Sequence, residues 1–503
     1  CCDPAPVAAG YARRATVSGG LMLFTRQCSV LAALLLVAVA ASLPAVADGE
    51  PESVEDVFDE RQTTQYVLDI EAAMARAQAA HGAIPQAAAD AIASKADARH
   101  APAEEIEKER RRVQHRMVAL INVWKRAIDP DVRQYVHYGA TTVDIYDTAI
   151  VLQLRRATLL FIDELRHIES VLVEMARTHQ DTIMAGRTLG QHALPITFGK
   201  KVSTWIGENR RDIERLKSIL AELDRSAILK GAVGTYAGLG SKAIDIERSF
   251  AKELGLAEPY PDDWHGTRDV FAFYALTLAL VSKLYGDIGQ ELFLLQMTDI
   301  GETSETRAST SVSSSSMAQK INPSKSEALI HASRTIPRLA EIILDDVVNF
   351  FERDSTAGPD AVLKDISIQT GRNLKTARVL LEQLQVNPAV MLENLGKTNG
   401  FIMAQRVAFA LAPKIGKDEA DEHLHGVIRR ALEEKVDFRN ALLNDRRVSK
   451  LLSPEEIDVL LDPRGYVGMA HDEVAAVIAH VETLRKSDPL IKGRDTHATG
   501  SIP

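Results

Sequence analysis

Long segments with apolar residues at helical spacing dominate this chain and constrain its fold more than any other feature. They run from Val54 to Ala80, Pro102 to Ala127, Asp144 to His179, Thr197 to Ala227, Thr267 to Thr303, Ser324 to Phe351 and Ile366 to Gln385. Several are much longer than an average helix of about 11 residues, and long helices with one apolar stripe bury it by packing as a bundle. No run alternates convincingly between apolar and polar residues. We therefore predict an all-α protein with a long-helix bundle core and little sheet.

The helical segments change character along the chain and predict its division into parts. The predicted parts are a leader with an upstream extension (1–47), an N-terminal helical domain (48–143), a central long-helix bundle (144–393), a C-terminal helical domain (394–485) and a disordered tail (486–503). The C-terminal domain is set apart because its helices are short, with Gly400, Gly416, Pro454 and Pro463 between them. The tail is set apart because it has no periodicity.

The segment from Met22 to Glu50 has the composition of a secretory signal peptide. Arg26 supplies a positive charge, an apolar run extends from Val30 to Leu43, and Ala45 to Ala47 has the small-x-small form of a cleavage site. The apolar run is shorter than the roughly 20 residues that a membrane-spanning helix needs. We expect cleavage after Ala47 and export without a stable membrane anchor. An uncleaved anchor is one alternative, and a cytoplasmic protein is the other if this leader is not used.

Charge and cysteine usage exclude several classes of function. The formal net charge of −10 argues against a nucleic-acid-binding surface, which is normally basic, but allows a locally cationic site for a small anion. The three cysteines, Cys1, Cys2 and Cys28, all precede the expected cleavage point. A mature chain without cysteine has no disulfide, no thiolate nucleophile and no Cys-ligated metal.

The stretch from Ser313 to Glu327, S-S-S-S-M-A-Q-K-I-N-P-S-K-S-E, lies between two of the long segments. Four consecutive serines have no buried face and predict a loop, and Pro323 suits the first turn of the helix that follows. A helix N-terminus offers free backbone N–H groups and a positive dipole end, which suit an anion. Lys320 adds a full positive charge to the same place. A flexible, solvated linker is the alternative interpretation.

This stretch resembles the signature loop of the fumarase/aspartase superfamily of lyases, whose pattern is G-S-S-x-M-P-x-K-x-N-P. The matching residues are Ser314, Ser315, Met317, Lys320, Asn322 and Pro323. Ser313 replaces the glycine of the pattern, and Ala318 replaces its first proline. The resemblance implies that Ser314 is the catalytic base, and that Lys320 and Asn322 hold a substrate carboxylate.

A second motif, V-H-Y-G-A-T-T-V-D-I-Y-D-T, runs from Val136 to Thr148 at the start of a long helical segment. Its hydroxyl residues suit a helix N-cap, so a purely structural role in starting the helix is the alternative. The motif resembles the first conserved region of the superfamily, H-x-G-A-T-S-x-D, and this resemblance implies that Thr141 and Thr142 contact the substrate. His137 is a candidate general acid, because an unperturbed imidazole titrates near pH 6.5.

A third motif, A-G-R-T-L-G-Q-H-A-L-P-I-T-F-G, spans Ala185 to Gly199 and resembles the second region of the superfamily, G-R-T-H-x-x-x-A-x-P-x-T-F-G. Its structural alternative is a turn between helices. The resemblance assigns substrate binding to Arg187, Thr188 and Gln191. Leu189 stands where nucleotide lyases and fumarases have a proton-transferring His. In many cycloisomerases of the group this position is also not His. We expect Leu189 to form part of the pocket wall. Leucine cannot move a proton, so the candidates for the general acid are His137 and His192.

Three further stretches are similar to the superfamily. They are Gly231 to Gly240, Trp264 to Asp269, and Glu352 to Asp354, the last of which adds Arg353 to the substrate-binding candidates. No strand is expected before the glycine-rich stretch, so a dinucleotide-binding loop is rejected. Glu327 normally partners the His that is missing here, and it is given a supporting role with Ser315 and Met317. His423 and His425 lie two residues apart on a predicted helix, on different faces, and are interpreted as surface residues.

Together these motifs identify the chain with the adenylosuccinate lyase and 3-carboxy-cis,cis-muconate cycloisomerase branch of the superfamily. The resemblance implies β-elimination or cycloisomerisation next to a carboxylate, a homotetramer whose active sites each combine motifs from three chains, and no metal or organic cofactor. Three hypotheses remain open at this point. The chain is a cycloisomerase-like enzyme acting on a small polycarboxylate, a C–N lyase that releases fumarate from a succinyl adduct, or a non-catalytic descendant that kept the fold.

Overall fold

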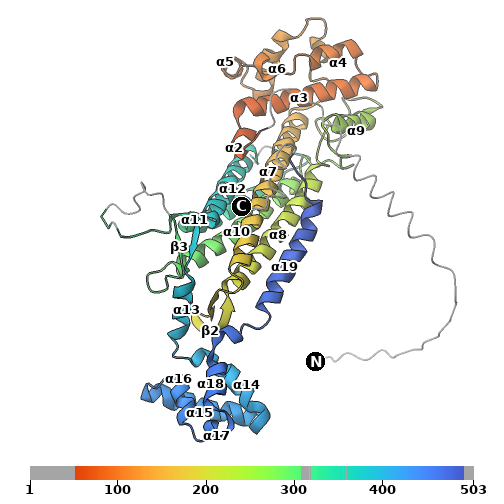
Figure 1. Ribbon diagram of the computed structural model, residues 1–503. Coiled ribbons are helices and arrows are strands. Elements are labelled where there is room, and N and C mark those ends of the chain that lie inside the picture. Colours follow the sequence, from red (N-terminus) through yellow and green to blue (C-terminus); the bar gives the residue numbers. More distant parts are fainter. Residues whose placement is uncertain (1–50, 307–315, 318, 355, 357–358, 492–503) are drawn as a thin grey trace, which may run out of the picture. The chain divides into compact units, whose positions relative to one another are not determined.

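The structure is a computed structural model, and it describes residues 51–306, 316–317, 319–354, 356 and 359–491. The predicted signal peptide lies outside the described residues, as do Ser313, Ser314, Ser315 and Ala318 of the signature loop. The part from Gly49 onward forms one compact unit, which Figure 1 shows as a set of helices with few strands. The predicted all-α class is confirmed.

The chain enters this unit through a group of mostly short helices. They are α2 (Val54–Val57), α3 (Glu60–Ala80), α4 (Gln86–Ala93), η1 (Ala98–His100), α5 (Ala103–Val113), α6 (Arg116–Trp124), η2 (Lys125–Ala127) and η3 (Arg133–Tyr135). The segments from Val54 to Ala80 and from Pro102 to Ala127 were each predicted as one helix, and both are broken. The Asp59 carboxylate accepts a hydrogen bond from the Arg61 N–H at 2.9 Å and begins α3 anew, and Gln114 ends α5 with a left-handed φ of 54°.

The core of the unit is a bundle of long helices. These are α7 (Thr142–Thr178), α8 (Phe198–Leu223), α10 (Asp269–Leu295), α11 (Ser324–Asp345), α12 (Pro359–Glu382) and α19 (Ala470–Leu484). In Figure 1, α7 runs beside α8 and α10 beside α11, while α12 packs on both α7 and α11. One apolar cluster joins them, with Leu165, Trp205, Tyr274, Ile336 and Leu374 all buried. Their apolar stripes therefore face one another, as the sequence periodicity predicts.

Helix α10 is the most apolar of these long helices. Among the described residues it is the one helix whose length and composition would allow it to cross a membrane. In this structure, 67% of its apolar window is buried inside the bundle. Its hydropathy is accounted for by its place in the core, between α8, α11 and α12.

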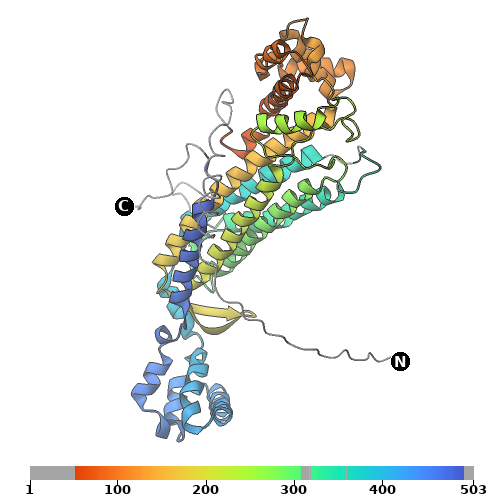
Figure 2. The same ribbon diagram turned by 90° about the vertical axis from the view of Figure 1, so that its right-hand side faces the viewer.

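Two small antiparallel sheets interrupt the helices. Strand β1 (Ile183–Thr188) pairs with β2 (Gln191–Thr197), and β3 (Thr303–Glu305) pairs with β4 (Leu384–Val386). The first pair is a hairpin that lies between α7 and α8 in the chain and extends from their ends, as Figure 2 shows. The third motif of the sequence therefore forms a hairpin and not the plain turn between helices that was the structural alternative.

The predicted boundary at residue 143 separates segments that pack together. Helix α9 (Ala243–Glu253) lies after α8 in the chain but packs on α3. Leu229 and Phe250 belong to the apolar cluster of the N-terminal helices, with Leu68 and Trp124. The N-terminal part is thus completed by a segment from within the predicted central bundle, because apolar side chains from both are buried in one core.

The C-terminal part begins with α13 (Pro388–Gly396) and continues through a set of short helices. They are η4 (Phe401–Met403), α14 (Ala404–Ile415), α15 (Lys417–Glu434), α16 (Phe438–Asn444), α17 (Val448–Leu451), α18 (Pro454–Leu461) and η5 (Pro463–Gly465). They have a core of their own around Leu411, Phe438 and Ile457. Helix α19 is different, because it packs on α8 and contributes Val481 to the bundle core. The predicted domain 394–485 therefore ends before α19.

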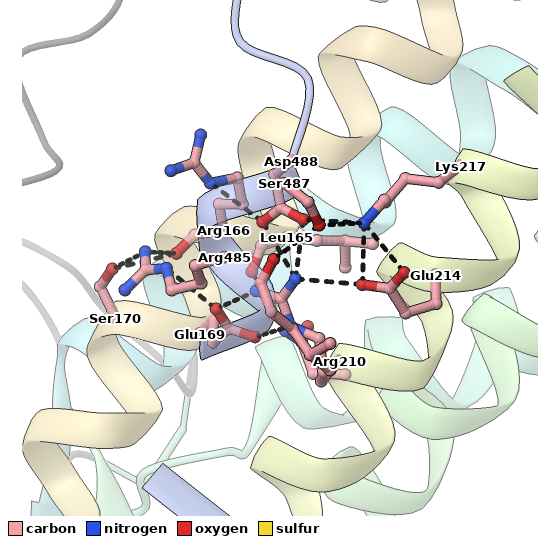
Figure 3. Close-up of polar contacts among 12 residues, drawn as sticks. Leu165, Arg166, Glu169, Ser170, Arg210, Glu214, Lys217, Arg485, Ser487 and Asp488 are labelled. Carbon is pink, nitrogen blue, oxygen red and sulfur yellow. Dashed lines mark hydrogen bonds and ion pairs between the residues drawn. The ribbon is translucent and has the colours of Figure 1, made fainter. Parts of the chain in front are cut away.

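The chain continues in order beyond α19, where a disordered tail was predicted from residue 486. After η6 (Arg485–Ser487), the carboxylate of Asp488 lies 2.9 Å from the Arg210 guanidinium on α8. Arg210 also binds Glu169 on α7 at 2.8 Å, and all three side chains are at most 2% exposed. Figure 3 shows these contacts. Ile491 joins the bundle core, so residues 486–491 belong to the fold.

Candidate functional site

The loop before α7 brings His137, Thr141 and Thr142 to the N-terminal end of that helix. His137 and Gly139 both have left-handed backbone, with φ of 60° and 77°. Glycine is needed at the second position, because an added Cβ would lie 2.6 Å from the Gly238 carbonyl oxygen. This close approach packs the glycine-rich stretch directly onto the first motif.

Asp144, fully buried in the first turn of α7, holds these two stretches together. Its carboxylate accepts hydrogen bonds from the backbone N–H groups of Thr141 at 2.9 Å, Lys230 at 3.0 Å and Gly231 at 3.1 Å. Burial raises the pKa of Asp144, and the N–H donors act in the opposite direction. His265 Nε2 lies 3.6 Å from the same carboxylate. Asp144 is thus a structural anchor, and it leaves the two threonines of the motif half-buried at the helix start.

A buried carboxylate from α3 lies behind His137. Glu71 Oε1 is 2.7 Å from His137 Nδ1, and Glu71 Oε2 accepts a hydrogen bond from the His137 backbone N–H at 3.1 Å. Burial lowers the pKa of His137, but the hydrogen bond and the charge of Glu71 outweigh it, so the pKa lies above its ordinary value. His137 is therefore stabilised in its protonated form.

The hairpin places Arg187, Thr188, Gln191 and His192 close together. Thr188 is paired with Gln191 and Arg187 with His192 across the two strands. The Arg187 guanidinium also makes two hydrogen bonds to Glu302, at 2.9 and 2.6 Å. Within one chain Arg187 thus has a carboxylate partner already, and its contact with substrate stays a prediction.

The pKa of His192 is shifted in the opposite direction to that of His137. Its pKa is lowered, first by burial and then by the positive charge of Arg187. His192 Nδ1 is buried and has no hydrogen-bond partner among the described residues. A neutral imidazole is a poorer proton donor than a protonated one, so of the two candidates for the general acid the structure favours His137.

Leu189 lies at the tip of the hairpin, followed by Gly190. Both residues have positive φ, 52° and 75°, as a tight two-residue turn requires. The Leu189 side chain is 100% exposed in the single chain. The expectation that Leu189 lies in a pocket wall is therefore not met within one chain, because nothing of this chain covers the tip.

The described part of the signature loop includes Met317, Lys320 and Asn322. The backbone N–H of Lys320 donates to the Met317 carbonyl oxygen at 3.0 Å, which makes a tight turn before α11. The Ile321 carbonyl oxygen accepts a hydrogen bond from Gln296 Nε2 at 3.0 Å. Met317 and Lys320 are exposed and Asn322 is half-buried. These residues form a surface segment that is attached to the end of α10.

The N-terminus of α11 is not open to an anion in the way that the sequence suggests. Glu305, from β3, accepts hydrogen bonds from the backbone N–H groups of Lys325 at 3.1 Å and Ser326 at 2.8 Å. The Ser326 hydroxyl donates to the same carboxylate at 2.8 Å. A protein carboxylate therefore occupies the first turn of α11, while Glu327 is exposed beside it. The backbone N–H groups of Lys325 and Ser326 are therefore already paired within the chain.

Arg353 lies in the segment after α11 and not with the signature loop. This segment packs against the start of α10, where a Cβ added to Gly266 would lie 2.6 Å from the Glu352 carbonyl oxygen. Arg353 Nη1 is buried and has no hydrogen-bond partner among the described residues. Gly266, which packs against Glu352, follows His265 in the chain, and His265 lies 3.6 Å from Asp144 of the first motif. Arg353 therefore belongs to the same end of the bundle as the first motif.

The candidate residues therefore form two groups. The first group is His137, Thr141, Thr142 and Arg353, and the second is Arg187, Thr188, Gln191, His192, Met317, Lys320, Asn322 and Glu327. Within the second group, the short segment from Glu302 to Glu305 connects the hairpin to the start of α11. The two groups lie at opposite ends of α7, whose 37 residues span about 55 Å at 1.5 Å per residue. A small substrate cannot contact both ends of one chain.

Four positioning residues were missed by the sequence analysis. They are Glu71 behind His137, Glu302 and Asn394 behind Arg187, and Glu305 at the start of α11. The one signal for Glu71 is a carboxylate within the apolar run from Ile70 to Ala75. Burial of such a group requires a partner, but the sequence does not show which residue supplies it.

Comparison with known proteins shows the family of the chain. A family model described as "Lyase" matches residues 49–337, and one described as "Adenylosuccinate lyase C-terminus" matches residues 400–477. The chain is 34% identical to an N-acetyl-S-(2-succino)cysteine lyase of Dickeya dadantii, over 86% of this chain and 95% of that protein. It is 33% identical to an adenylosuccinate lyase of Methanocaldococcus jannaschii, over 86% and 94%.

A solved structure extends the comparison to three dimensions. The 3-carboxy-cis,cis-muconate lactonizing enzyme from Pseudomonas putida superposes with a TM-score of 0.79 at 32% identity, covering 86% of this chain and 97% of that one. The lyase family model covers more than half of the chain, and the relatives match almost their whole length. On these grounds the chain belongs to the fumarase/aspartase superfamily of lyases and is an enzyme of that family.

Proposed function

We propose that this enzyme removes a proton next to a carboxylate of a small polycarboxylate and breaks or forms the bond β to it, in the manner of a 3-carboxy-cis,cis-muconate cycloisomerase. The observation that carries the proposal is the hairpin tip, where Leu189 occupies the place of a proton-transferring His. Since Leu189 cannot protonate a leaving group, the reaction must be one that needs little help from an acid at that position.

The electronic steps assign a role to each candidate residue. Ser314 takes the proton from the carbon next to the carboxylate, and the electron pair left behind is delocalised into that carboxylate. Lys320 and Asn322 stabilise the resulting dianion by charge and hydrogen bonding. The pair then forms the C=C bond as the β bond breaks and the leaving atom departs with its own electrons. His137 donates a hydrogen bond or a proton to that atom.

Leaving-group basicity separates the possible substrates. A carboxylate, released when a lactone ring opens, is the anion of an acid with a pKa of about 4, whereas an amine leaving group has a conjugate acid near 10. The carboxylate departs as the anion, whereas the amine must be protonated as it leaves. The missing His at position 189 therefore favours lactone chemistry over C–N cleavage.

Release of fumarate from a succinyl thioether is the second candidate. A thiol has a pKa of about 8.5, so a thiolate leaves more readily than an amine. The similarity to the N-acetyl-S-(2-succino)cysteine lyase of Dickeya dadantii supports this candidate specifically. Both candidates use the same base and carboxylate site and differ in the group that departs.

We also propose that the enzyme is a homotetramer with composite sites. The two groups of candidate residues lie at opposite ends of α7, so a complete site needs a first group from one chain and a second group from another. A neighbouring chain would also cover Leu189, which is exposed in the single chain.

A substrate panel tests the proposed function. The full chain is assayed for lactonisation of a carboxymuconate and for fumarate release, by absorbance at 240 nm, from S-(2-succino)cysteine and from aspartate adducts. Lactonisation is expected to be fastest, and Ser314→Ala should lower it by orders of magnitude without loss of folding. Ser218→Ala is the control, because the exposed Ser218 hydroxyl donates to the Glu214 carbonyl oxygen within α8, away from all three motifs. A preference for amine adducts would contradict the leaving-group argument.

A further inference from the structure

Glu71 makes contact with both the ring and the backbone of His137. One carboxylate oxygen lies 2.7 Å from Nδ1 and the other accepts the backbone N–H at 3.1 Å. The Glu71 side chain is 1% exposed, whereas that of His137 is 21% exposed. The carboxylate is thus inaccessible to a ligand, but the imidazole is not.

These two contacts fix the orientation of His137. The hydrogen bond to the backbone N–H stabilises the left-handed backbone of His137, whose φ of 60° is uncommon for residues other than glycine. The contact at Nδ1 requires a proton on that nitrogen, because a carboxylate only accepts hydrogen bonds. His137 therefore meets any ligand through Nε2.

The charges around His137 come from three elements. Glu71 on α3 and Asp144 on α7 favour the protonated ring, and Lys125 in η2 opposes it. Glu71 is the one of the three that makes a hydrogen bond to the ring. An imidazole hydrogen-bonded to a buried carboxylate can carry a positive charge at a pH where a free imidazole is neutral.

We propose that Glu71 is a positioning residue of the active site, which keeps His137 protonated and directs Nε2–H toward an anionic substrate. The proposal rests on the proposed function for the place of His137 in the site. It assigns to α3, a helix outside all three motifs, the task of supplying the site with a cationic hydrogen-bond donor. That donor takes over part of the role of the His that Leu189 replaces.

A purely structural pair between α3 and the loop is the competing explanation. It predicts that loss of Glu71 changes stability alone. Our proposal predicts a change in the protonation of His137, which can be measured without any substrate. Failure of the proposed function would leave this measurement intact, so the two outcomes are distinguishable.

The experiment is residue-specific deuterium exchange at histidine C2, followed by mass spectrometry across a pH series on the full chain. In the wild type, the titration midpoint of His137 should lie above 6.5, the ordinary value for histidine. In Glu71→Gln it should fall, while His471, paired with Asp181 elsewhere on the surface, stays unchanged as an internal reference. A wild-type midpoint below 6.5 would overturn the proposal even if the variant failed to fold.

A matched control removes another carboxylate that faces α3. Glu253 on α9 pairs with Arg76 on α3 at 2.6 Å and is not among the charges around His137, so Glu253→Gln should leave the His137 midpoint unchanged. With a substrate in hand, the protonated His137 is the active form, so the rate falls as pH rises through its titration. Glu71→Gln should move that fall to lower pH and reduce the rate at pH 8 about tenfold. An equal shift in both variants would contradict a specific role for Glu71.

Discussion

Leu189 shows how the chemistry of one position can depend on a neighbouring chain. Its side chain is fully exposed at the tip of the hairpin, and the positive φ of Leu189 and Gly190 closes the two-residue turn. An exposed apolar side chain at a turn contributes little to the stability of its own chain. If the position matters for catalysis, it does so in a site that another copy completes.

Leu189→His is predicted to leave the folding of the single chain unchanged, because the hairpin tip is exposed there. Activity is expected to decrease, since a polar and chargeable group replaces an apolar contact beside an anionic substrate. Thermal unfolding and steady-state rates measure the two effects, with Leu189→Met as the apolar control. A faster Leu189→His enzyme would mean that the chain is a damaged fumarate-releasing lyase that lacks its proton donor.

At the scale of elements, short acidic segments position the functional loops. The segment from Glu302 to Glu305 makes two hydrogen bonds to Arg187 of the hairpin and caps α11 through Ser326. Both carboxylates are at most 4% exposed, so each needs the partners that this segment gives it. The hairpin and the signature loop are therefore connected through one rigid piece of backbone.

The C-terminal segment is fixed to the bundle in a comparable way. Asp488 lies 2.9 Å from Arg210, which also binds Glu169, and Lys217 and Arg485 contact the same group of charges, as Figure 3 shows. Removing one partner from such a group leaves another charge buried without compensation. The segment is thus expected to be an integral part of the stability of the bundle.

Asp488→Asn is predicted to destabilise the protein by about 3–5 kcal/mol, because it leaves the buried Arg210 guanidinium short of negative charge. The measurement is urea unfolding of the full chain followed by circular dichroism. Asp458→Asn is the matched control, since Asp458 pairs with Arg439 at the surface, where both side chains are about half exposed. Equal midpoints for the two variants would show that the segment after α19 contributes little to the fold.

For the whole molecule, the central observation is that the candidate residues of one chain fall into two separate groups. The first motif and Arg353 lie at one end of α7, and the hairpin follows its other end, about 55 Å away. The segment from Glu302 to Glu305 connects the start of α11 to that hairpin. In the proposed homotetramer, one assembly step would both bury Leu189 and complete the site. We expect activity to depend on protein concentration below the dissociation constant of the oligomer.

Mixing of inactive variants tests the composite site. His137→Gln damages the first group and Lys320→Met damages the second, so each variant alone should be nearly inactive. Co-expressed in equal amounts, they should recover about a quarter of the wild-type rate, because random mixing leaves one site in four with both groups intact. No recovery, with oligomers shown to be mixed by mass spectrometry, would mean that both groups act from the same chain.

The sequence by itself determined the fold class, most of the long helices and the identity of the motif residues. Helix α7 was predicted from Asp144 to His179 and runs from Thr142 to Thr178, because apolar periodicity and a capping carboxylate are local features. The superfamily was indicated by the resemblance of the three motifs to its conserved regions. The predicted export and the role of Ser314 remain predictions, since those residues lie outside the described part of the chain.

Only the tertiary structure decided which groups stand behind the motif residues. His137 meets Glu71 across 66 positions of sequence, and Arg187 meets Glu302 across 115. It also decided that α19 returns to the bundle and that the motifs separate to the two ends of α7. A helical period reports which side of a helix is buried, but it carries no information on which distant segment covers that side. Such pairs are set by packing of the whole chain, where each buried charge must find its partner.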